Sequence, residues 1–365
     1  MTDRLDAMHA FLRGAGWGAA DISLLPGDAS TRRYARASLN GRVAMVMDQP
    51  QAAEAPVAAV HATPQERKSL GYNAVARLAG ADCVRFVAVA AYLRDKGLSA
   101  PNIYAADTAE GFLLLEDLGN DLYADVLAAG GNELELYKAA ADVLATLHAQ
   151  DAPTLLAPDK PLFSYDETAL LAEVDLLTEW YFPFALGRKA SADEVAEHRA
   201  LWTQALKPAL VSRPVFVHRD YHAQNLLWLP QRYGGARAGL IDFQDAVAGN
   251  RAYDLVSLTE DARRDVSQEL AAATTAHYLG AMQAQGSPLD EKAFAGEMAI
   301  MAAQRNAKIV GIFARLHSRD GKPRYLSYLP RVWSYLNRDL AHPALAGLSA
   351  WYDQAIPHHV RMKDS

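Results

Sequence analysis

The stretch that decides the fold reads HRDYHAQN over residues 218–225, and IDF follows at residues 241–243. Apolar runs at 215–217 and 238–241 precede them, which predicts short buried strands that end in polar loops. Asp220 lies in the loop after 215–217, and Asn225 begins the next short strand. Asp242 directly follows the apolar run at 238–241. This order of strands and polar residues is a stronger signal than an isolated H-x-D-x-x-x-x-N pattern.

These three residues supply the groups that phosphoryl transfer requires. The reaction needs a carboxylate near the acceptor hydroxyl, oxygen ligands for Mg²⁺ and a closed pocket. Asp220 can orient the acceptor hydroxyl and take its proton, while the side-chain oxygens of Asn225 and Asp242 suit a hard divalent cation. The alternative is that all three are polar turn residues. The flanking strands favour an ATP-dependent kinase of small molecules.

The composition is that of an ordinary globular protein, large enough for two lobes. Of 365 residues, 51% are hydrophobic and 22% are charged, and the formal net charge is -7 without a basic run, so nucleic acid is not an expected partner. The single cysteine, Cys83, excludes an internal disulfide. The charged N-terminus has no apolar signal core, and no stretch approaches the roughly 20 apolar residues that span a bilayer. We expect a cytoplasmic monomer without membrane contact.

Hydrophobic periodicity divides the chain into a β-rich part and a helical part. Asn40-Gly41 predicts a tight hairpin turn. The other elements expected early in the chain are a helix at 3–14, strands at 33–37, 42–48, 103–106 and 111–115, and a helix at about 81–97. The later helices are expected at about 133–149, 166–187, 192–210, 263–285, 289–316 and 325–339. Residues 49–80 give no clear assignment. The prediction is an α+β fold with an N-terminal lobe at 1–116 and a C-terminal lobe at 117–365.

This order of parts resembles the aminoglycoside-phosphotransferase and choline-kinase superfamily, which has a bilobal protein-kinase-like fold. Four stretches make the resemblance more specific: GDASTRRY at 27–34, FLLLEDLG at 112–119, DFQDA at 242–246 and YDLVSL at 253–258. They are similar to the bacterial N-acetylmuramate/N-acetylglucosamine anomeric kinases of cell-wall recycling, and the similarity runs across nearly the whole chain. The resemblance implies ATP and Mg²⁺ as cofactors and an amino sugar as acceptor.

The resemblance also implies roles for individual residues. Asp220 would be the catalytic base, Asn225 and Asp242 would hold Mg²⁺, and Asp254 would brace the catalytic loop. The implied ATP contacts are Ser30 and Thr31 over the phosphates, the backbone of the connector between the lobes at Glu116 and Leu118, and Leu227 and Ile241 under the adenine.

One departure from the kinase pattern concerns the third strand, which usually supplies a lysine to the ATP phosphates. Met47 stands at the position where that lysine is expected, and the helix around 84–89 has no glutamate to pair with it. The replacement cation is expected from Arg32, Arg33 or Arg36 on the neighbouring strand. The alternative is that these arginines are exposed strand charges.

The acceptor site is expected to combine polar side chains with an aromatic face, because sugars are bound in this way. His222, Gln244 and Asp245 lie close in sequence to the base and the metal aspartate, and Trp180 offers an aromatic face. The alternatives are that the first three brace loops and that Trp180 packs in the core. For the whole chain, the alternatives to an amino-sugar kinase are a kinase for another hydroxyl, such as an aminoglycoside or amino alcohol, and a pseudokinase that only binds.

Overall fold

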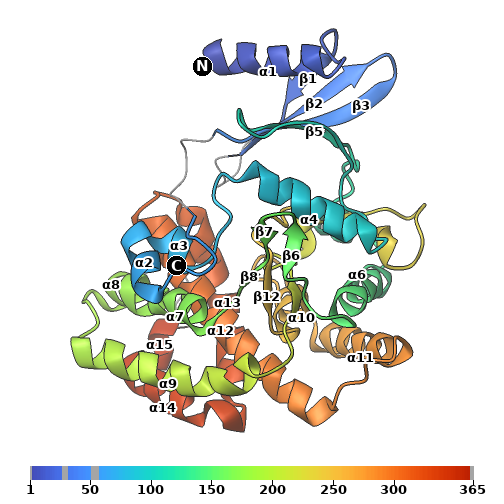
Figure 1. Ribbon diagram of the computed structural model, residues 1–365. Coiled ribbons are helices and arrows are strands. Elements are labelled where there is room, and N and C mark those ends of the chain that lie inside the picture. The colour runs from blue at the N-terminus through green and yellow to red at the C-terminus, as the bar shows by residue number, and fades with distance from the viewer. Residues whose placement is uncertain (1, 27–31, 51–56, 362–365) are drawn as a thin grey trace.

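The computed structural model describes residues 2–26, 32–50 and 57–361, and it shows a small lobe above a larger helical one (Figure 1). The small lobe contains a five-stranded antiparallel sheet with the order β1-β2-β3-β5-β4. Its strands are β1 Asp21–Leu24, β2 Arg33–Leu39, β3 Arg42–Asp48, β4 Ile103–Asp107 and β5 Phe112–Glu116. The predicted bilobal α+β fold is confirmed.

The β2–β3 hairpin turns at Asn40-Gly41, as the sequence predicted. Both residues have positive φ, 50° and 78°, which is the backbone conformation of the tight turns that suit twisted strands. Pairing is continuous from Arg33 opposite Asp48 to Leu39 opposite Arg42. This pairing fixes which side chains face each side of the sheet.

Each face of the sheet is covered by one helix, α1 (Thr2–Gly14) above and α4 (Cys83–Asp95) below in Figure 1. Val46 belongs to the buried cluster formed with α1, whereas its neighbour Met47 belongs to the main core with Phe86 of α4. This alternation follows from the two-residue repeat of a strand.

The larger lobe is mostly helical and also contains short strands. Its helices are α5 Tyr123–Ala128, α6 Glu133–His148, α7 Glu167–Leu176, α8 Phe182–Leu186, α9 Ala192–Leu210, α10 Ala252–Thr259, α11 Gln268–Ala284, α12 Glu291–Ser318, α13 Leu329–Leu340, α14 Ala346–Ala355 and α15 His358–Arg361. Its strands include β8 Phe163–Ser164, β9 Val215–Val217, β10 Leu226–Trp228, β11 Ala238–Leu240 and β12 Val247–Gly249. The strands β8, β12 and β9 form one small sheet, and β10 and β11 form a hairpin. The loops that follow β9 and β11 carry the residues predicted for catalysis.

The long helix expected at 166–187 is interrupted. The π-helical turn η2 (Leu177–Tyr181) follows α7 and is succeeded by α8. At this point α12 crosses closely, because a Cβ atom added to Gly311 would lie 2.4 Å from the carbonyl carbon of Leu176. The sequence periodicity of 166–187 contains no information about this crossing, so the interruption was not predicted.

The described part of residues 49–80 forms two short helices, α2 (Pro64–Leu70) and α3 (Tyr72–Val75). The sequence places them inside the expected N-terminal lobe, but in Figure 1 they lie beside α7 and α8 of the larger lobe. Buried Arg67 anchors them, because its guanidinium binds both carboxylate oxygens of Asp166, at 2.5 and 3.0 Å, and the carbonyl of Val75. The lobe boundary at residue 116 therefore does not describe this segment.

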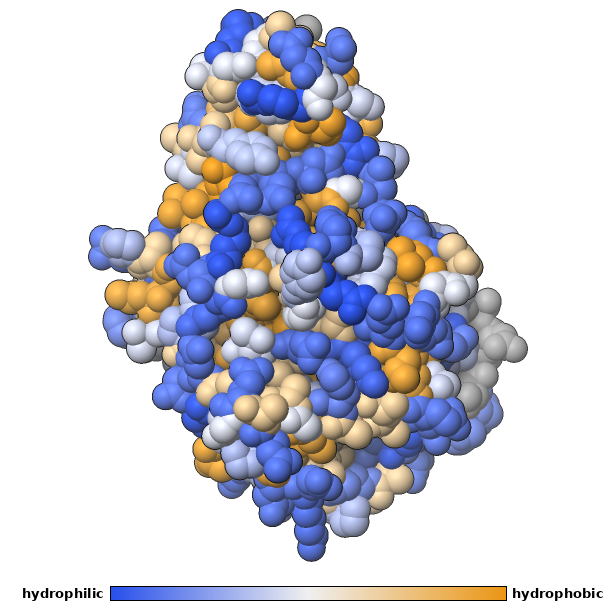
Figure 2. Space-filling view, turned by 90° about the vertical axis from the view of Figure 1, so that its right-hand side faces the viewer, coloured by the Kyte–Doolittle hydropathy of each residue, from blue (hydrophilic) through white to orange (hydrophobic). Residues whose placement is uncertain are grey.

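The molecular surface is mixed in character. On the face in Figure 2, hydrophilic side chains cover most of both lobes and apolar ones occur in small, separate groups. Within the described ranges, no helix combines the length and apolar character needed to cross a bilayer.

Candidate active site

The loop that carries Asp220 leaves β9 and is held by Asp254 of α10. The buried carboxylate of Asp254 accepts the backbone N–H groups of His218 at 2.6 Å and of Arg219 at 2.9 Å. Arg219 has a φ of 77°, which is a strained conformation for a residue with a side chain. The brace that the sequence predicted at Asp254 is present, and it fixes the strained residue immediately before Asp220.

Asp220, Asn225 and Asp242 meet at one pocket of about 450 Å³, which His222 and Arg263 also line. The side-chain Nδ2 of Asn225 donates to the backbone carbonyl of Asp220 at 2.9 Å and lies 3.5 Å from Oδ2 of Asp242. Because Nδ2 is directed to the loop, Oδ1 of Asn225 is the atom available to a cation. The structure thus brings together the three residues that the sequence singled out first.

Asp242 has a cation beside it already. Nη2 of Arg32 lies 3.0 Å from Oδ1 of Asp242, and Nε2 of Gln244 donates to the same oxygen at 3.2 Å. Burial raises the pKa of the Asp242 carboxyl and the nearby Asp220 raises it further, while Arg32 acts in the opposite direction. A carboxylate in this setting gains from a positive charge, so Asp242 and Asn225 fit a hard metal ion.

Asp220 is kept in its ionised form by the charges around it. Burial alone would raise the pKa of its carboxyl, but the positive charges of Lys308 and Arg219 lower the pKa below its ordinary value. An ionised carboxylate at the pocket is the form that can accept a proton.

Arg36 has side-chain partners within the protein. Its Nε lies 2.6 Å from Oδ2 of Asp117, and its Nη2 donates to Oδ1 of Asn120 at 2.7 Å. Both partners belong to the connector after β5, so Arg36 ties the sheet to the connector. These contacts give Arg36 a structural role, while contact of Arg36 with the cofactor stays a prediction.

Glu116 marks the end of β5 and the start of the connector. Its carboxylate accepts Arg232 at 2.7 Å and the side-chain amide of Asn102 at 2.6 Å, so the side chain is engaged within the protein. The prediction for Glu116 concerned the connector backbone, and nothing in the side-chain contacts tests it.

The predicted adenine floor forms a continuous apolar patch. Leu227 pairs with Gly239 across the β10–β11 hairpin, and Ile241 follows on the same side of the strand. A Cβ atom added to Gly239 would lie 3.2 Å from Leu227 and 3.4 Å from the Cδ1 atom of Leu118. The structure therefore brings Leu118 of the connector next to the floor residues.

The position where kinases carry the phosphate-binding lysine is apolar. Met47 is 1% exposed and lies in the same core as Phe86 of α4, whose ring centroid lies 4.7 Å from that of Phe243. Of the arginines on the neighbouring strand, Arg32 reaches the metal aspartate and Arg33 is exposed. Ser30 and Thr31, predicted over the phosphates, lie outside the described residues.

Residues 21–289 match the family described as the phosphotransferase enzyme family, and they include the five-stranded sheet and every lining residue of this pocket except Tyr325. The chain belongs to this family. It is a small-molecule kinase, in agreement with the prediction from HRDYHAQN.

This phosphotransferase is similar over its whole length to characterised relatives. An N-acetylmuramate/N-acetylglucosamine kinase of Caulobacter vibrioides is 45% identical over 365 residues, which cover 99% of each chain. The kinase of the same name from Pseudomonas aeruginosa is 35% identical and covers 91% of this chain and 89% of its own.

Solved structures support the fold of the phosphotransferase. A microcompartment-associated aminopropanol kinase superposes with a TM-score of 0.59 at 15% identity, covering 92% of this chain and 98% of its own. The ADP-bound aminoglycoside phosphotransferase APH(2'')-Ib superposes with a TM-score of 0.51 at 16% identity, covering 90% and 94%.

The residues predicted to bind the acceptor have protein partners in this phosphotransferase. Nε2 of His222 lies 3.2 Å from Nη1 of Arg263, Gln244 donates to Asp242, and Asp245 accepts the backbone N–H of Ala79 at 2.6 Å. His222, Gln244 and Asp245 therefore each have a contact that can brace a loop. Their contact with substrate stays a prediction. Trp180 lies half-buried on η2, is packed against the core, and is not among the residues that line the pocket.

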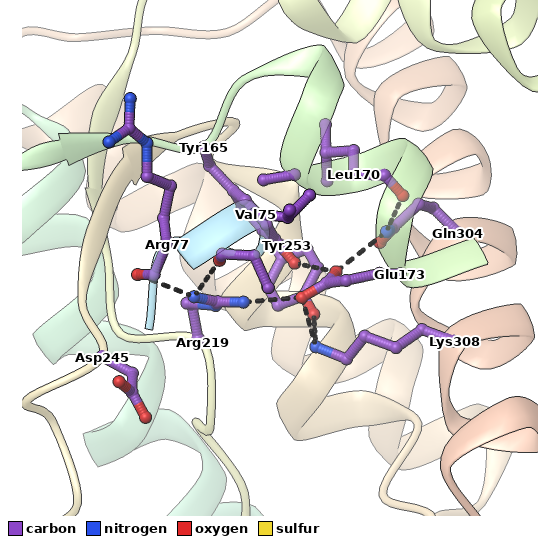
Figure 3. Close-up of polar contacts among 12 residues, drawn as sticks. Val75, Arg77, Tyr165, Leu170, Glu173, Arg219, Asp245, Tyr253, Gln304 and Lys308 are labelled. Atoms are coloured by element: carbon purple, nitrogen blue, oxygen red, sulfur yellow. Dashed lines mark hydrogen bonds and ion pairs between the residues drawn. The ribbon is translucent and has the colours of Figure 1, made fainter. Parts of the chain in front are cut away.

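Sequence reasoning missed a buried charge network behind the catalytic loop of the phosphotransferase (Figure 3). Glu173 of α7 lies at its centre and contacts Arg219 and Lys308, with Tyr165 and Gln304 on its other side. The sequence signal was weak: Glu173 and Lys308 are charged residues inside largely apolar helical runs, and Asp175 and Arg305 lie close to them in sequence. Only the fold shows that they approach each other across 135 residues of chain.

Proposed function

We propose that this phosphotransferase uses ATP to phosphorylate the anomeric hydroxyl of N-acetylmuramate, N-acetylglucosamine or both, as a monomer in the cytoplasm during recycling of cell-wall peptidoglycan. The observation that carries the choice of acceptor is the 45% identity to the Caulobacter vibrioides kinase over the full length. The assembled Asp220–Asn225–Asp242 pocket supports turnover and speaks against a protein that only binds.

The donor set fits Mg²⁺ and a nucleotide. Asn225 and Asp242 would hold the metal through their side-chain oxygens, and the patch of Leu118, Leu227 and Ile241 would receive the adenine. ATP bound with Mg²⁺ would supply the phosphoryl group and offset its negative charge. Arg32, which contacts Asp242 at 3.0 Å, would provide the cation that the position of Met47 lacks.

Asp220 would act on the acceptor. An anomeric hydroxyl is somewhat more acidic than that of an ordinary alcohol, so a carboxylate is an adequate base for it. The bond from Asn225 to the carbonyl of Asp220 and the brace of Asp254 fix where the carboxylate lies, because they restrain the loop on both sides. The proton of the hydroxyl would move to a carboxylate oxygen of Asp220 as the new O–P bond forms.

A panel of acceptors tests the proposed function. With Mg²⁺ and ATP, N-acetylmuramate and N-acetylglucosamine should each give a product whose phosphorus NMR signal couples to an anomeric proton. Ethanolamine and an aminoglycoside serve as controls and should give no product at the same enzyme concentration. Phosphorylation of one of these controls, with neither amino sugar modified, would contradict the proposal.

The role of Arg32 gives a separate prediction. Replacing Arg32 by Gln should raise the Kd of Mg²⁺-ATP about 10-fold or more, because a hydrogen bond to a charged partner is lost. Isothermal titration measures this directly. Arg33→Gln changes the next residue in the same way and, because Arg33 is exposed, should alter the Kd by less than about twofold. Equal effects of both substitutions would refute a specific role for Arg32.

A further inference from the structure

The pocket that contains Asp220 has one positively charged wall. Three carboxylates line the pocket, those of Asp125, Asp220 and Asp242. In the part of the chain that the structure describes, Arg263 is the only arginine or lysine among the lining residues. An anionic group that enters the pocket is therefore repelled by the carboxylates and attracted to Arg263. This distribution of charge favours one orientation for an acceptor that carries a negative charge.

Arg263 lies in the short turn between α10 and α11, and its neighbours in this turn bind other helices. Arg264 contacts Glu133 of α6 at 2.6 Å, while Asp265 contacts Arg331 of α13 at 2.5 Å. These two ion pairs hold the turn from both sides. Arg263 lines the pocket between them, so its position depends on three parts of the larger lobe and is well defined.

Buried Asp261 connects the same turn to the catalytic loop. Its Oδ1 accepts the backbone N–H of Arg263 at 2.8 Å, and its Oδ2 accepts the backbone N–H of Ala223 at 3.3 Å. Ala223 is three residues from Asp220 in the loop that leaves β9. One carboxylate therefore sets the spacing between the backbone of Arg263 and the loop that carries the base.

The half-buried side chain of Arg263 has a neutral partner. Its Nη1 lies 3.2 Å from Nε2 of His222, and because a guanidinium only donates, Nε2 is the acceptor of this bond. A guanidinium has five N–H donors. Over residues 2–26, 32–50 and 57–361, His222 accepts one of them and no carboxylate forms an ion pair with Arg263. A partly desolvated cation of this kind gains from an anionic partner.

We propose that Arg263 is an acceptor-binding residue that binds the lactyl carboxylate of N-acetylmuramate. This inference rests on the proposed amino-sugar acceptor. N-acetylmuramate is N-acetylglucosamine with a lactyl ether on O3, and its carboxylate is ionised at neutral pH. Guanidinium and carboxylate can form two parallel hydrogen bonds. Because O3 lies away from the anomeric carbon, this contact orients the sugar and leaves the anomeric hydroxyl to Asp220.

The first test compares Arg263→Gln and Arg263→Lys with Arg94→Gln, a control at an exposed arginine of α4. Arg263→Gln should raise the KM of N-acetylmuramate roughly 10- to 100-fold, because charge-assisted hydrogen bonds are lost. N-acetylglucosamine lacks the carboxylate, so the ratio of kcat/KM for N-acetylmuramate to that for N-acetylglucosamine should fall at least about fivefold. Arg263→Lys keeps the charge and should recover part of the loss. Arg94→Gln should keep the wild-type ratio.

The second test changes the acceptor instead of the protein. The methyl ester of N-acetylmuramate keeps the shape of the lactyl group and removes its charge. For the wild type, the ester should have a KM about 10-fold or more above that of the acid. For Arg263→Gln, the two KM values should differ by less than about threefold, because the charge no longer has its partner. The wild-type comparison holds even where the variant fails to fold.

Three results would overturn the inference. One is an equal KM for acid and ester in a wild type that phosphorylates both amino sugars, and another is a wild type that phosphorylates N-acetylglucosamine alone. Both leave the proposed function intact. A third is a rise in the Kd of Mg²⁺-ATP, measured by isothermal titration, as large as the rise in the KM of N-acetylmuramate, which would assign Arg263 to the phosphates. A wild type that phosphorylates neither amino sugar removes the proposed function and this inference together.

Discussion

Replacing Asp220 by Asn is expected to lower kcat about 10³- to 10⁴-fold, because the acceptor hydroxyl loses the group that takes its proton. The substitution keeps the size of the side chain and leaves the backbone carbonyl that Asn225 binds. Steady-state kinetics with N-acetylglucosamine measures the loss. The Kd of Mg²⁺-ATP should change little, since the proposed metal ligands are Asn225 and Asp242.

A matched control for this prediction is Asp95→Asn. Asp95 is exposed at the end of α4, so the same chemical change there should leave kcat within about twofold of wild type. Turnover near the wild-type level in Asp220→Asn would remove Asp220 from the mechanism. A large loss of unfolding temperature would instead show that the variant is damaged.

Replacing Gly311 by Ala is expected to lower the free energy of unfolding by about 3 kcal/mol, the upper end of the range for overpacked cores. The new methyl group would lie 2.4 Å from the carbonyl carbon and 2.6 Å from the Cβ of Leu176, so backbone has to move. Helices α7 and α12 would separate at the point where the chain forms η2. Urea unfolding, followed by circular dichroism, measures the change.

For Gly296 in the same helix, we expect the opposite change in the free energy of unfolding. A Cβ atom at that position meets only the ring of His342, at 3.9 Å. Gly296→Ala should therefore raise the free energy of unfolding by roughly 0.5–1 kcal/mol, because alanine loses less conformational entropy in a helix than glycine. If both substitutions gave the same sign, the close crossing at Gly311 would not be the cause.

The parts of the fold that the sequence predicted depend on local chemistry. Asn40-Gly41 specifies its turn through the conformations that these two residues tolerate. The loop with Asp220 and Asn225 was found because its polar residues and flanking strands lie within one short stretch. In both cases the information needed is contained in neighbouring residues.

The parts that the sequence did not predict depend on partners far apart in the chain. The bond of Arg36 to Asp117 was not predicted, because the two residues lie 81 positions apart in the chain. Glu173 and Lys308 are separated by 135 residues, and periodicity alone marks each as one of several polar positions in its helix. Periodicity within one helix cannot identify its partner in another helix, because the pairing depends on how the helices cross in the fold.

The segment between α3 and α4 is bonded to the two loops that carry Asp220 and Asp242. Just before α4 begins, the carbonyl groups of Ala76 and Arg77 accept the guanidinium of Arg219, and the N–H of Ala79 donates to Asp245. Any outward swing of α4 would pull on these bonds and hence on both functional loops at once. Helix α4 is therefore tethered to the loops that carry Asp220 and Asp242, and releasing this connection would disturb both loops together.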